Sequence, residues 1–239
     1  MINDIIWEFQ DCDGIDYLKE IFSLLIGEFE RIFGYETMNS EKCLVYNDTQ
    51  AGCPMFIINS APVRIRLAQS SLICWSQTIF QLSHELCHYA IRQHKAQKEL
   101  TLSWIEEIMC EAVSLYALKY CAINWSQCGL STRSPDYFKS IFEYLDNELN
   151  KSGTTGLKDC KTPELLSQYE TIADTDRESH RNERRLLYQE ISKNPTDCLT
   201  FCKYQKYINS NGITIDFDTW ENEDSSQLVR VLHILQPCT

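Results

Sequence analysis

A pair of histidines four residues apart constrains this chain more than any other feature of its sequence. His84 and His88 lie in the segment 75–93, whose apolar residues recur at helical spacing: Ile79, Leu82, Leu86 and Ala90. Residues four apart on a helix lie on one face, about one turn from each other. The segment is therefore predicted to fold as a long helix whose two imidazoles can reach a single metal ion.

Glu85 follows the first histidine and completes the pattern His-Glu-x-x-His. On a helix, this pattern is typical of a catalytic zinc site in which the glutamate acts as general base. Glu85 is rotated toward the side where a metal-bound water would lie. Because bound zinc lowers the pKa of its water to about 7, the pattern predicts metal-assisted hydrolysis of an amide.

A catalytic zinc site usually has a third protein ligand and keeps a fourth position open for water. A second predicted helix, 104–120, begins with Trp104-Ile105-Glu106-Glu107, and eighteen residues separate His88 from Glu107. In this spacing and in these residues the chain resembles the gluzincin metallopeptidases, of the thermolysin and aminopeptidase N type. The aminopeptidases show Trp-Leu-Asn-Glu at this place. The resemblance implies that Glu107 is the third ligand of one zinc ion.

The resemblance covers about residues 75–118 and implies a zincin-like metallopeptidase fold with a peptide or protein substrate. It also implies that Glu111, four residues after Glu107, supports the first histidine. Ile108-Met109 replaces the small-aromatic pair usual in the aminopeptidases, and their Gly-rich exopeptidase motif is not visible upstream. The resemblance therefore extends to the ligands and to Glu85, not to aminopeptidase specificity. We interpret Glu106 as an ordinary exposed helix acid.

Gluzincins usually add a tyrosine or histidine that stabilises the oxyanion. His180, in the charged segment 176–185, is the first candidate, and Tyr144 and Tyr169 are weaker ones. The other interpretation of His180 is a residue on a solvated, charged helix face. The strand predicted at 63–67 is a candidate wall of the cleft, where an edge strand can pair with an extended peptide.

Two other functions stay open. Cys43 lies 41 residues before His84, and peptide deformylases resemble this pattern because they combine an upstream cysteine ligand with His-Glu-x-x-His. Their Gly-rich N-terminal motif is missing here, so a buried structural thiol is the competing interpretation of Cys43. The second alternative is a non-catalytic zincin-like protein that binds metal or a partner. Glu85 argues against it, because a purely structural site needs no general base.

The remaining patterns predict an α+β chain that is mostly helical. Strands at 42–47, 56–59 and 63–67 are expected to form a small N-terminal mixed sheet, with helices at 15–33, 75–93, 104–120 and 135–149. A polar loop at 150–162 precedes a charged helix to residue 193, a helix from residue 195, a short strand at 213–217 and a helix at 225–235. We expect residues 1–149 to form the catalytic core and residues 150–239 a helical part packed on it.

Charge and composition exclude several classes of partner. Asp and Glu outnumber Lys and Arg by 34 to 22, and such an acidic chain repels phosphate backbones and anionic membrane surfaces. Neither nucleic acid nor membrane is therefore an expected partner. No apolar run reaches the ~20 residues that span a bilayer, and no export signal is visible at the N-terminus. We expect a cytoplasmic protein whose twelve cysteines stay reduced.

Overall fold

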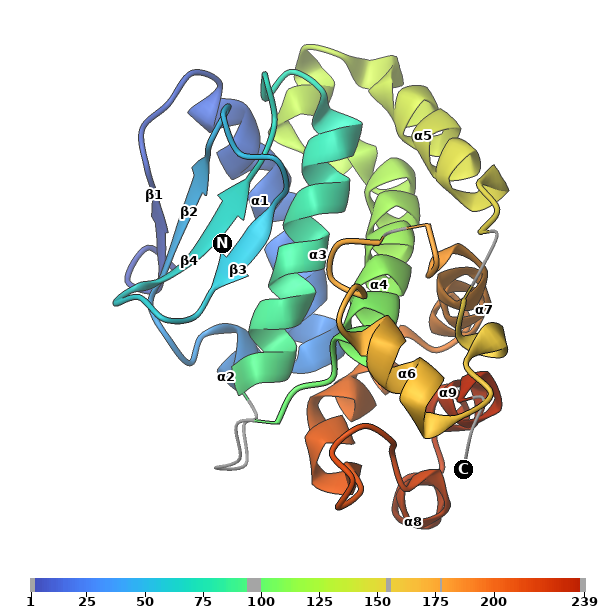
Figure 1. The fold of residues 1–239 in the computed structure, drawn as a ribbon. Coiled ribbons are helices and arrows are strands. Elements are labelled where there is room, and N and C mark those ends of the chain that lie inside the picture. Colours follow the sequence, from blue (N-terminus) through green and yellow to red (C-terminus); the bar gives the residue numbers. More distant parts are fainter. Residues whose placement is uncertain (1–2, 94–99, 154–155, 177, 237–239) are drawn as a thin grey trace.

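The structure is a computed structural model that describes residues 3–93, 100–153, 156–176 and 178–236. It has an α+β fold in which helices predominate and four strands form one small mixed sheet (Figure 1). The strands lie in the order β1 (Trp7–Phe9), β2 (Cys43–Asn47), β4 (Val63–Leu67) and β3 (Met55–Ile57). The first three are parallel, and β3 runs antiparallel to β4. The predicted α+β class is confirmed.

The sheet buries one of its faces. In β4, Val63, Ile65 and Leu67 are buried and Arg64 is exposed, as the alternation of apolar and charged residues predicts. However, β4 pairs on both sides, and the edge next to it is β3. The prediction that 63–67 provides an edge strand is therefore wrong. Strand order depends on pairing between distant segments, which the alternation within one strand does not encode.

Two helices pack on the buried face of the sheet. The ring of Phe22, in α1 (Ile15–Phe33), has its centroid 4.9 Å from that of Trp7 in β1. The helix α3 (Trp75–Gln93) packs against β4 and against α1. Its bounds are those predicted from the apolar spacing, so the histidine-bearing helix is confirmed. A short helix, α2 (Tyr35–Met38), leads from α1 toward β2.

The centre of the molecule is the contact between α3 and α4 (Ser103–Ile123), which lie side by side (Figure 1). The helix α4 is buried almost all round because α5 (Phe138–Asn150) and α7 (Arg181–Ile191) also pack on it. Glu170, the last residue of α6 (Pro163–Glu170), accepts hydrogen bonds from the N–H groups of Ser103 at 2.7 Å and Trp104 at 2.8 Å. These bonds satisfy donors that a helix start leaves unpaired, and they fix where α4 begins.

The C-terminal part completes the same core. It contains a 3₁₀ segment (Pro195–Tyr207), α8 (Phe217–Glu223) and α9 (Gln227–Leu235). The helix predicted from residue 195 begins there as a 3₁₀ helix, the helix predicted at 225–235 is α9, and α8 was not predicted. Shorter 3₁₀ helices lie at Trp125–Gln127, Gly129–Thr132, Pro135–Tyr137 and Leu157–Asp159. Side chains from both sides of residue 150 share one apolar cluster, among them Leu115, Leu187 and Phe201. The division of the chain at residue 150 stays a prediction.

The single helix predicted over 163–193 is wrong, because α6 ends at Glu170 and α7 begins at Arg181. Between them, the hydroxyls of Thr171 and Thr175 donate to carbonyls of the preceding turn, at 2.7 Å and 3.0 Å. Short polar side chains that bond locally in this way compete with the helical hydrogen bonds of the backbone. The result is a loop between α6 and α7.

The strand predicted at 213–217 is also wrong, since Ile215 forms only an isolated bridge with Ile208. The chain turns into α8 instead, because the carboxylate of Asp216 accepts a hydrogen bond from the N–H of Thr219 at 3.0 Å. This is the side-chain cap that favours a helix start.

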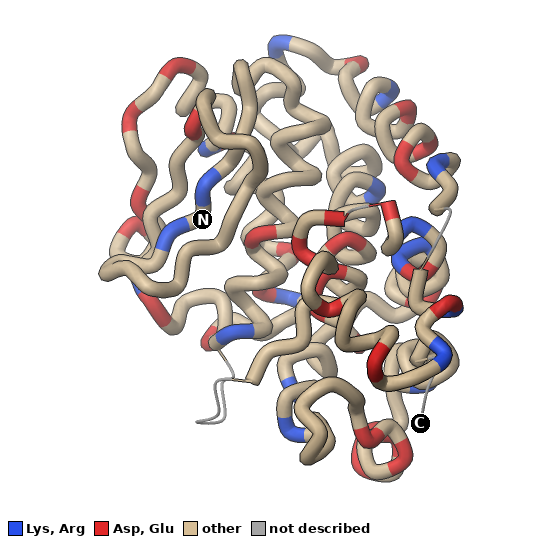
Figure 2. The backbone as a smooth tube through the Cα atoms, in the orientation of Figure 1, with Lys and Arg blue, Asp and Glu red and all other residues tan. Residues whose placement is uncertain are grey.

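Within the described residues, no helix has both the length and the apolar character needed to cross a membrane. The described cysteines form no disulfide, and Cys238 lies outside the described residues. The charge of the chain is unevenly placed. Figure 2 shows acidic residues gathered where α3 and α4 meet the loop between α6 and α7.

Candidate metal centre

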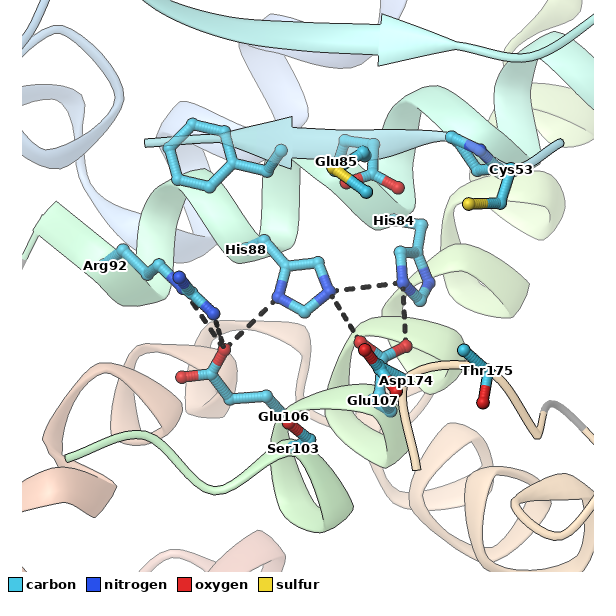
Figure 3. Close-up of a pocket in the computed structure, with 13 residues that line it drawn as sticks. Cys53, His84, Glu85, His88, Arg92, Ser103, Glu106, Glu107, Asp174 and Thr175 are labelled. Carbon is cyan, nitrogen blue, oxygen red and sulfur yellow. Dashed lines mark hydrogen bonds and ion pairs between the residues drawn. The ribbon is translucent and has the colours of Figure 1, made fainter. Parts of the chain in front are cut away.

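His84, His88 and Glu107 converge where α3 meets α4 (Figure 3). The two Nε2 atoms of the histidines lie 3.2 Å apart. Oε2 of Glu107 lies 3.2 Å from Nε2 of His84, and Oε1 lies 3.2 Å from Nε2 of His88. All three residues are buried, and together they can hold a metal ion. The structure therefore brings together the three residues that the sequence predicts as metal ligands.

Two rigid helices position these ligands. On α3, the side chains of Leu82 and Leu86 are fully buried in the core, which directs the intervening His84 away from it and toward α4. On α4, Glu107 lies in the second turn after the start that Glu170 fixes. A site on two packed helices is held more firmly than one on loops.

The interpretation of Glu106 as an exposed acid is wrong. This residue is 1% exposed, and its Oε2 lies 3.3 Å from Nδ1 of His88 and 3.2 Å from Nη2 of Arg92. The hydroxyl of Tyr204 donates a hydrogen bond to the other oxygen, Oε1. A carboxylate that accepts from one nitrogen of a histidine leaves the other nitrogen for a metal, and it fixes the orientation of the ring. Sequence reasoning missed this role, since Tyr204 lies far along the chain.

Charge in the site is balanced between carboxylates and imidazoles. Burial by itself lowers the pKa of His88, but the neighbouring carboxylates of Glu107 and Glu106 outweigh burial and hold that pKa well above its ordinary value. Burial by itself raises the pKa of Glu107, but His88 and His84 outweigh it and hold that pKa well below its usual range. Both shifts indicate a place where positive charge is stabilised.

A pocket of about 240 Å³ opens onto the three ligands. Residues 53–56, in β3 and just before it, line one side, and Asp174 and Thr175 from the loop between α6 and α7 line another (Figure 3). Glu85 is only 2% exposed but also lines this pocket. The predicted general base and the predicted ligands thus share one cavity. No residue of β4 lines it, so the prediction that the strand at 63–67 lines the cleft is wrong; the strand in this wall is β3.

The expected contact between Glu111 and the first histidine is absent. Instead, Nη1 of Arg184 donates to Oε2 of Glu111. Arg184 is 3% exposed, and its Nη2 also lies 3.1 Å from Oε2 of Glu148. A buried guanidinium competes strongly for a nearby carboxylate. Nδ1 of His84 is buried and has no hydrogen-bond partner within the described part of the chain.

His180 does not reach the pocket. It is fully buried, with Nδ1 at 2.7 Å from the hydroxyl of Tyr169 and Nε2 at 2.6 Å from the carbonyl of Ala173. The interpretation as a residue on a solvated face is equally wrong. Tyr144 lines a different pocket, together with Glu111. None of the three candidate oxyanion donors lines the pocket over the ligands.

Cys43 is likewise separate from the ligands. It is a fully buried core residue of β2, and burial raises the pKa of its thiol. It is not part of the ligand group, whose third member is Glu107. The deformylase-like set of ligands is therefore not assembled, and the interpretation of Cys43 as a buried structural thiol is confirmed.

Comparisons of this chain with protein-family models, with curated proteins and with solved structures gave no match. The function is therefore inferred from the residues and their geometry.

Proposed function

We propose that this chain is a zinc-dependent hydrolase that cleaves amide bonds in peptides, on a zincin-like fold with gluzincin-type ligands. The observation that carries the proposal is the arrangement of His84, His88 and Glu107 in the wall of a pocket that Glu85 also lines. A purely structural metal site needs no general base, whereas Glu85 stands at the general-base position of the His-Glu-x-x-His pattern.

The donor atoms fit zinc in kind and in spacing. Two imidazole nitrogens and one carboxylate oxygen form a common ligand set of catalytic zinc sites. Bonds of 2.0–2.1 Å at tetrahedral angles would place neighbouring ligand atoms about 3.3 Å apart. The two Nε2 atoms lie 3.2 Å apart, and each lies 3.2 Å from a different oxygen of Glu107. One ligand atom from each of the three residues lies within 4.8 Å of the other two. The pocket provides room for a water molecule and a substrate at the remaining position.

A zinc ion held by these residues would supply Lewis-acid chemistry, lowering the pKa of water and polarising the substrate carbonyl. The residues of the chain supply the proton transfers and the orientation. Glu85 accepts a proton from the attacking water and delivers it to the amine that leaves. Glu106 keeps the ring of His88 in its ligating orientation.

The edge strand offers a way to bind an extended peptide. Met55 and Phe56 of β3 line the pocket, and β3 has β4 on one side and no described strand on the other. The free edge presents backbone N–H and C=O groups that can pair with a peptide. A peptide bound there would run along the wall of the pocket that contains Glu85.

The test compares two glutamate substitutions in zinc-loaded protein incubated with a mixed peptide library. Glu85→Gln removes the general base, and Glu143→Gln on α5 is the matched control because Glu143 is exposed and does not line the pocket. We expect Glu85→Gln to keep one zinc and to lose at least about a hundredfold in cleavage rate, while Glu143→Gln cleaves like the unsubstituted protein.

Cleavage that survives Glu85→Gln would contradict the role of Glu85, and so would loss of the metal on that substitution. No turnover of any peptide, together with a fourth protein ligand on the metal, would favour the non-catalytic alternative.

A further inference from the structure

The loop between α6 and α7 forms one wall of the pocket. The sequence patterns did not predict this loop. Asp174 and Thr175 of this loop line the cavity that contains His84, His88 and Glu107, on the opposite side from β3 (Figure 3). Both residues are exposed. A substrate bound in this pocket would therefore face this loop on one side.

Buried contacts hold the loop in place. Ala173, next to Asp174, is fully buried, and its carbonyl lies 2.6 Å from Nε2 of the buried His180. The carbonyl of Ile172 accepts hydrogen bonds from the N–H groups of Thr175 at 2.9 Å and Asp176 at 2.8 Å. The carboxylate of Asp174 is thus presented to the pocket from a fixed backbone.

Asp174 differs from the other carboxylates in the pocket. Glu106 is paired with His88 and Arg92, and Glu107 contacts both histidines. Glu85 has an interaction of its own within the protein. Within the described part of the chain, the carboxylate of Asp174 has neither a hydrogen-bond nor an ion-pair partner, so it is available to a ligand.

The charge of the pocket points to the sign of that ligand. Four carboxylates and one guanidinium, that of Arg92, line the cavity. With neutral histidines and a divalent metal ion in place, one net negative charge remains. Without Asp174 the same pocket would be neutral. The net negative charge of the pocket favours the binding of a positively charged group. This favourable electrostatic energy depends on the carboxylate of Asp174.

We propose that Asp174 is a specificity-determining residue that binds an ammonium or guanidinium group of the peptide substrate. The inference rests on the proposed peptidase function and adds the class of substrate, a peptide that is cationic near the cleaved bond. The positive group is either the side chain of Lys or Arg or a free N-terminal amine, both of which form the same ion pair with a carboxylate.

Four versions of one peptide separate these sources. They carry lysine or norleucine at the same position, each with a free or an acetylated N-terminus. Cleavage is measured with zinc-loaded protein and with its variants Asp174→Asn and Asp176→Asn. Asp176 is the matched control because it lies in the same loop and carries the same charge but does not line the pocket, and asparagine can keep its hydrogen bond to the N–H of Glu178.

The unsubstituted protein should cleave the cationic peptides with a kcat/KM about two- to fivefold higher than the neutral one, as expected for an ion pair at an exposed carboxylate. Asp174→Asn should remove this preference mainly through KM, and Asp176→Asn should keep it. If acetylation of the N-terminus abolishes the preference, the group that binds Asp174 is the N-terminal amine. If norleucine in place of lysine abolishes it, that group is the lysine side chain. Equal cleavage of all four peptides, or a preference that survives Asp174→Asn, would overturn the proposal.

A binding measurement separates this proposal from the proposed activity. Zinc-loaded Glu85→Gln protein, with and without Asp174→Asn, is titrated with the four peptides labelled with a fluorophore. Tighter binding of the cationic peptides that requires Asp174 would support the inference even if no peptide is cleaved. Binding that does not depend on peptide charge would overturn it whether or not the protein is a peptidase.

Discussion

Oε2 of Glu106 lies 3.3 Å from Nδ1 of His88, on the side of the ring opposite to the candidate metal position. The next residue, Glu107, contacts the other nitrogen, with its Oε1 at 3.2 Å from Nε2. Two consecutive glutamates of α4 therefore contact the two nitrogens of one histidine. In the proposed metal site, the first would orient the ring and the second would complete the ligand set.

These different roles predict that substitutions of the two glutamates weaken zinc binding to different extents. Glu106→Gln should weaken zinc binding about 10- to 100-fold, as removal of a partner behind a metal-binding histidine usually does. Glu107→Ala should weaken it far more, because a ligand is lost. Competition with a chromogenic chelator measures both affinities, with Glu143→Gln as the control. A larger loss of zinc affinity for Glu106→Gln than for Glu107→Ala would indicate that Glu106, not Glu107, is the ligand.

Tyr204 connects the C-terminal part to the site and should stabilise the fold. Its hydroxyl donates to Oε1 of Glu106 and accepts from the N–H of Leu102 at 3.1 Å. Tyr204→Phe leaves a buried donor and a buried acceptor without this partner, which should lower the free energy of unfolding by about 1–3 kcal/mol. Urea denaturation measures this change. Tyr35→Phe, at a tyrosine that is 56% exposed, should have no measurable effect.

Glu170 should stabilise the start of α4, and the loss of stability on substitution should depend on how many acceptor oxygens remain. Glu170→Ala removes both acceptors for the N–H groups of Ser103 and Trp104, at a cost of about 1–2 kcal/mol in the free energy of unfolding. Glu170→Gln keeps one acceptor oxygen and should cost less. Thermal and chemical denaturation measure the series. An alanine variant as stable as the unsubstituted protein would show that these bonds do not stabilise the helix start.

Arg184 should be essential for stability although it lies outside the pocket over the ligands. It is buried and pairs with Glu111 and Glu148. Arg184→Met leaves the buried carboxylate of Glu111 without its partner, which should cost about 3–5 kcal/mol in the free energy of unfolding. Glu148 loses one of two partners, since Lys151 still lies 2.6 Å from its Oε1. The neighbouring Arg185 is exposed, so Arg185→Met is the matched control. Equal unfolding midpoints for the two variants would contradict the role assigned to Arg184.

The sequence predicted the parts of this structure that depend on local spacing. The apolar repeat of α3 gave its bounds, and the four-residue spacing placed His84 and His88 on one face. Glu107 was predicted from the eighteen residues between it and His88 and from the resemblance of residues 104–107 to the gluzincin motif, not from helical periodicity. The alternation in β4 gave the correct buried face.

The partners of the site were not predictable in this way, because they come from distant segments. Glu106 is paired with Tyr204, 98 residues away, and Glu111 with Arg184, 73 residues away. No periodicity within α4 distinguishes an exposed glutamate from one that meets a buried tyrosine. The same reason explains why His180 was assigned to the site. A histidine in a charged segment gave no sign that Tyr169 and Ala173 would enclose it.

The central claim is that one metal ion binds to His84, His88 and Glu107. X-ray data collected on either side of the zinc absorption edge, from crystals of the purified protein, test it most directly. We expect a single anomalous peak about 2.0–2.2 Å from both Nε2 atoms and from an oxygen of Glu107, with no fourth protein ligand. An anomalous peak at another group of residues, or zinc-supplemented crystals without a peak at these three side chains, would contradict it.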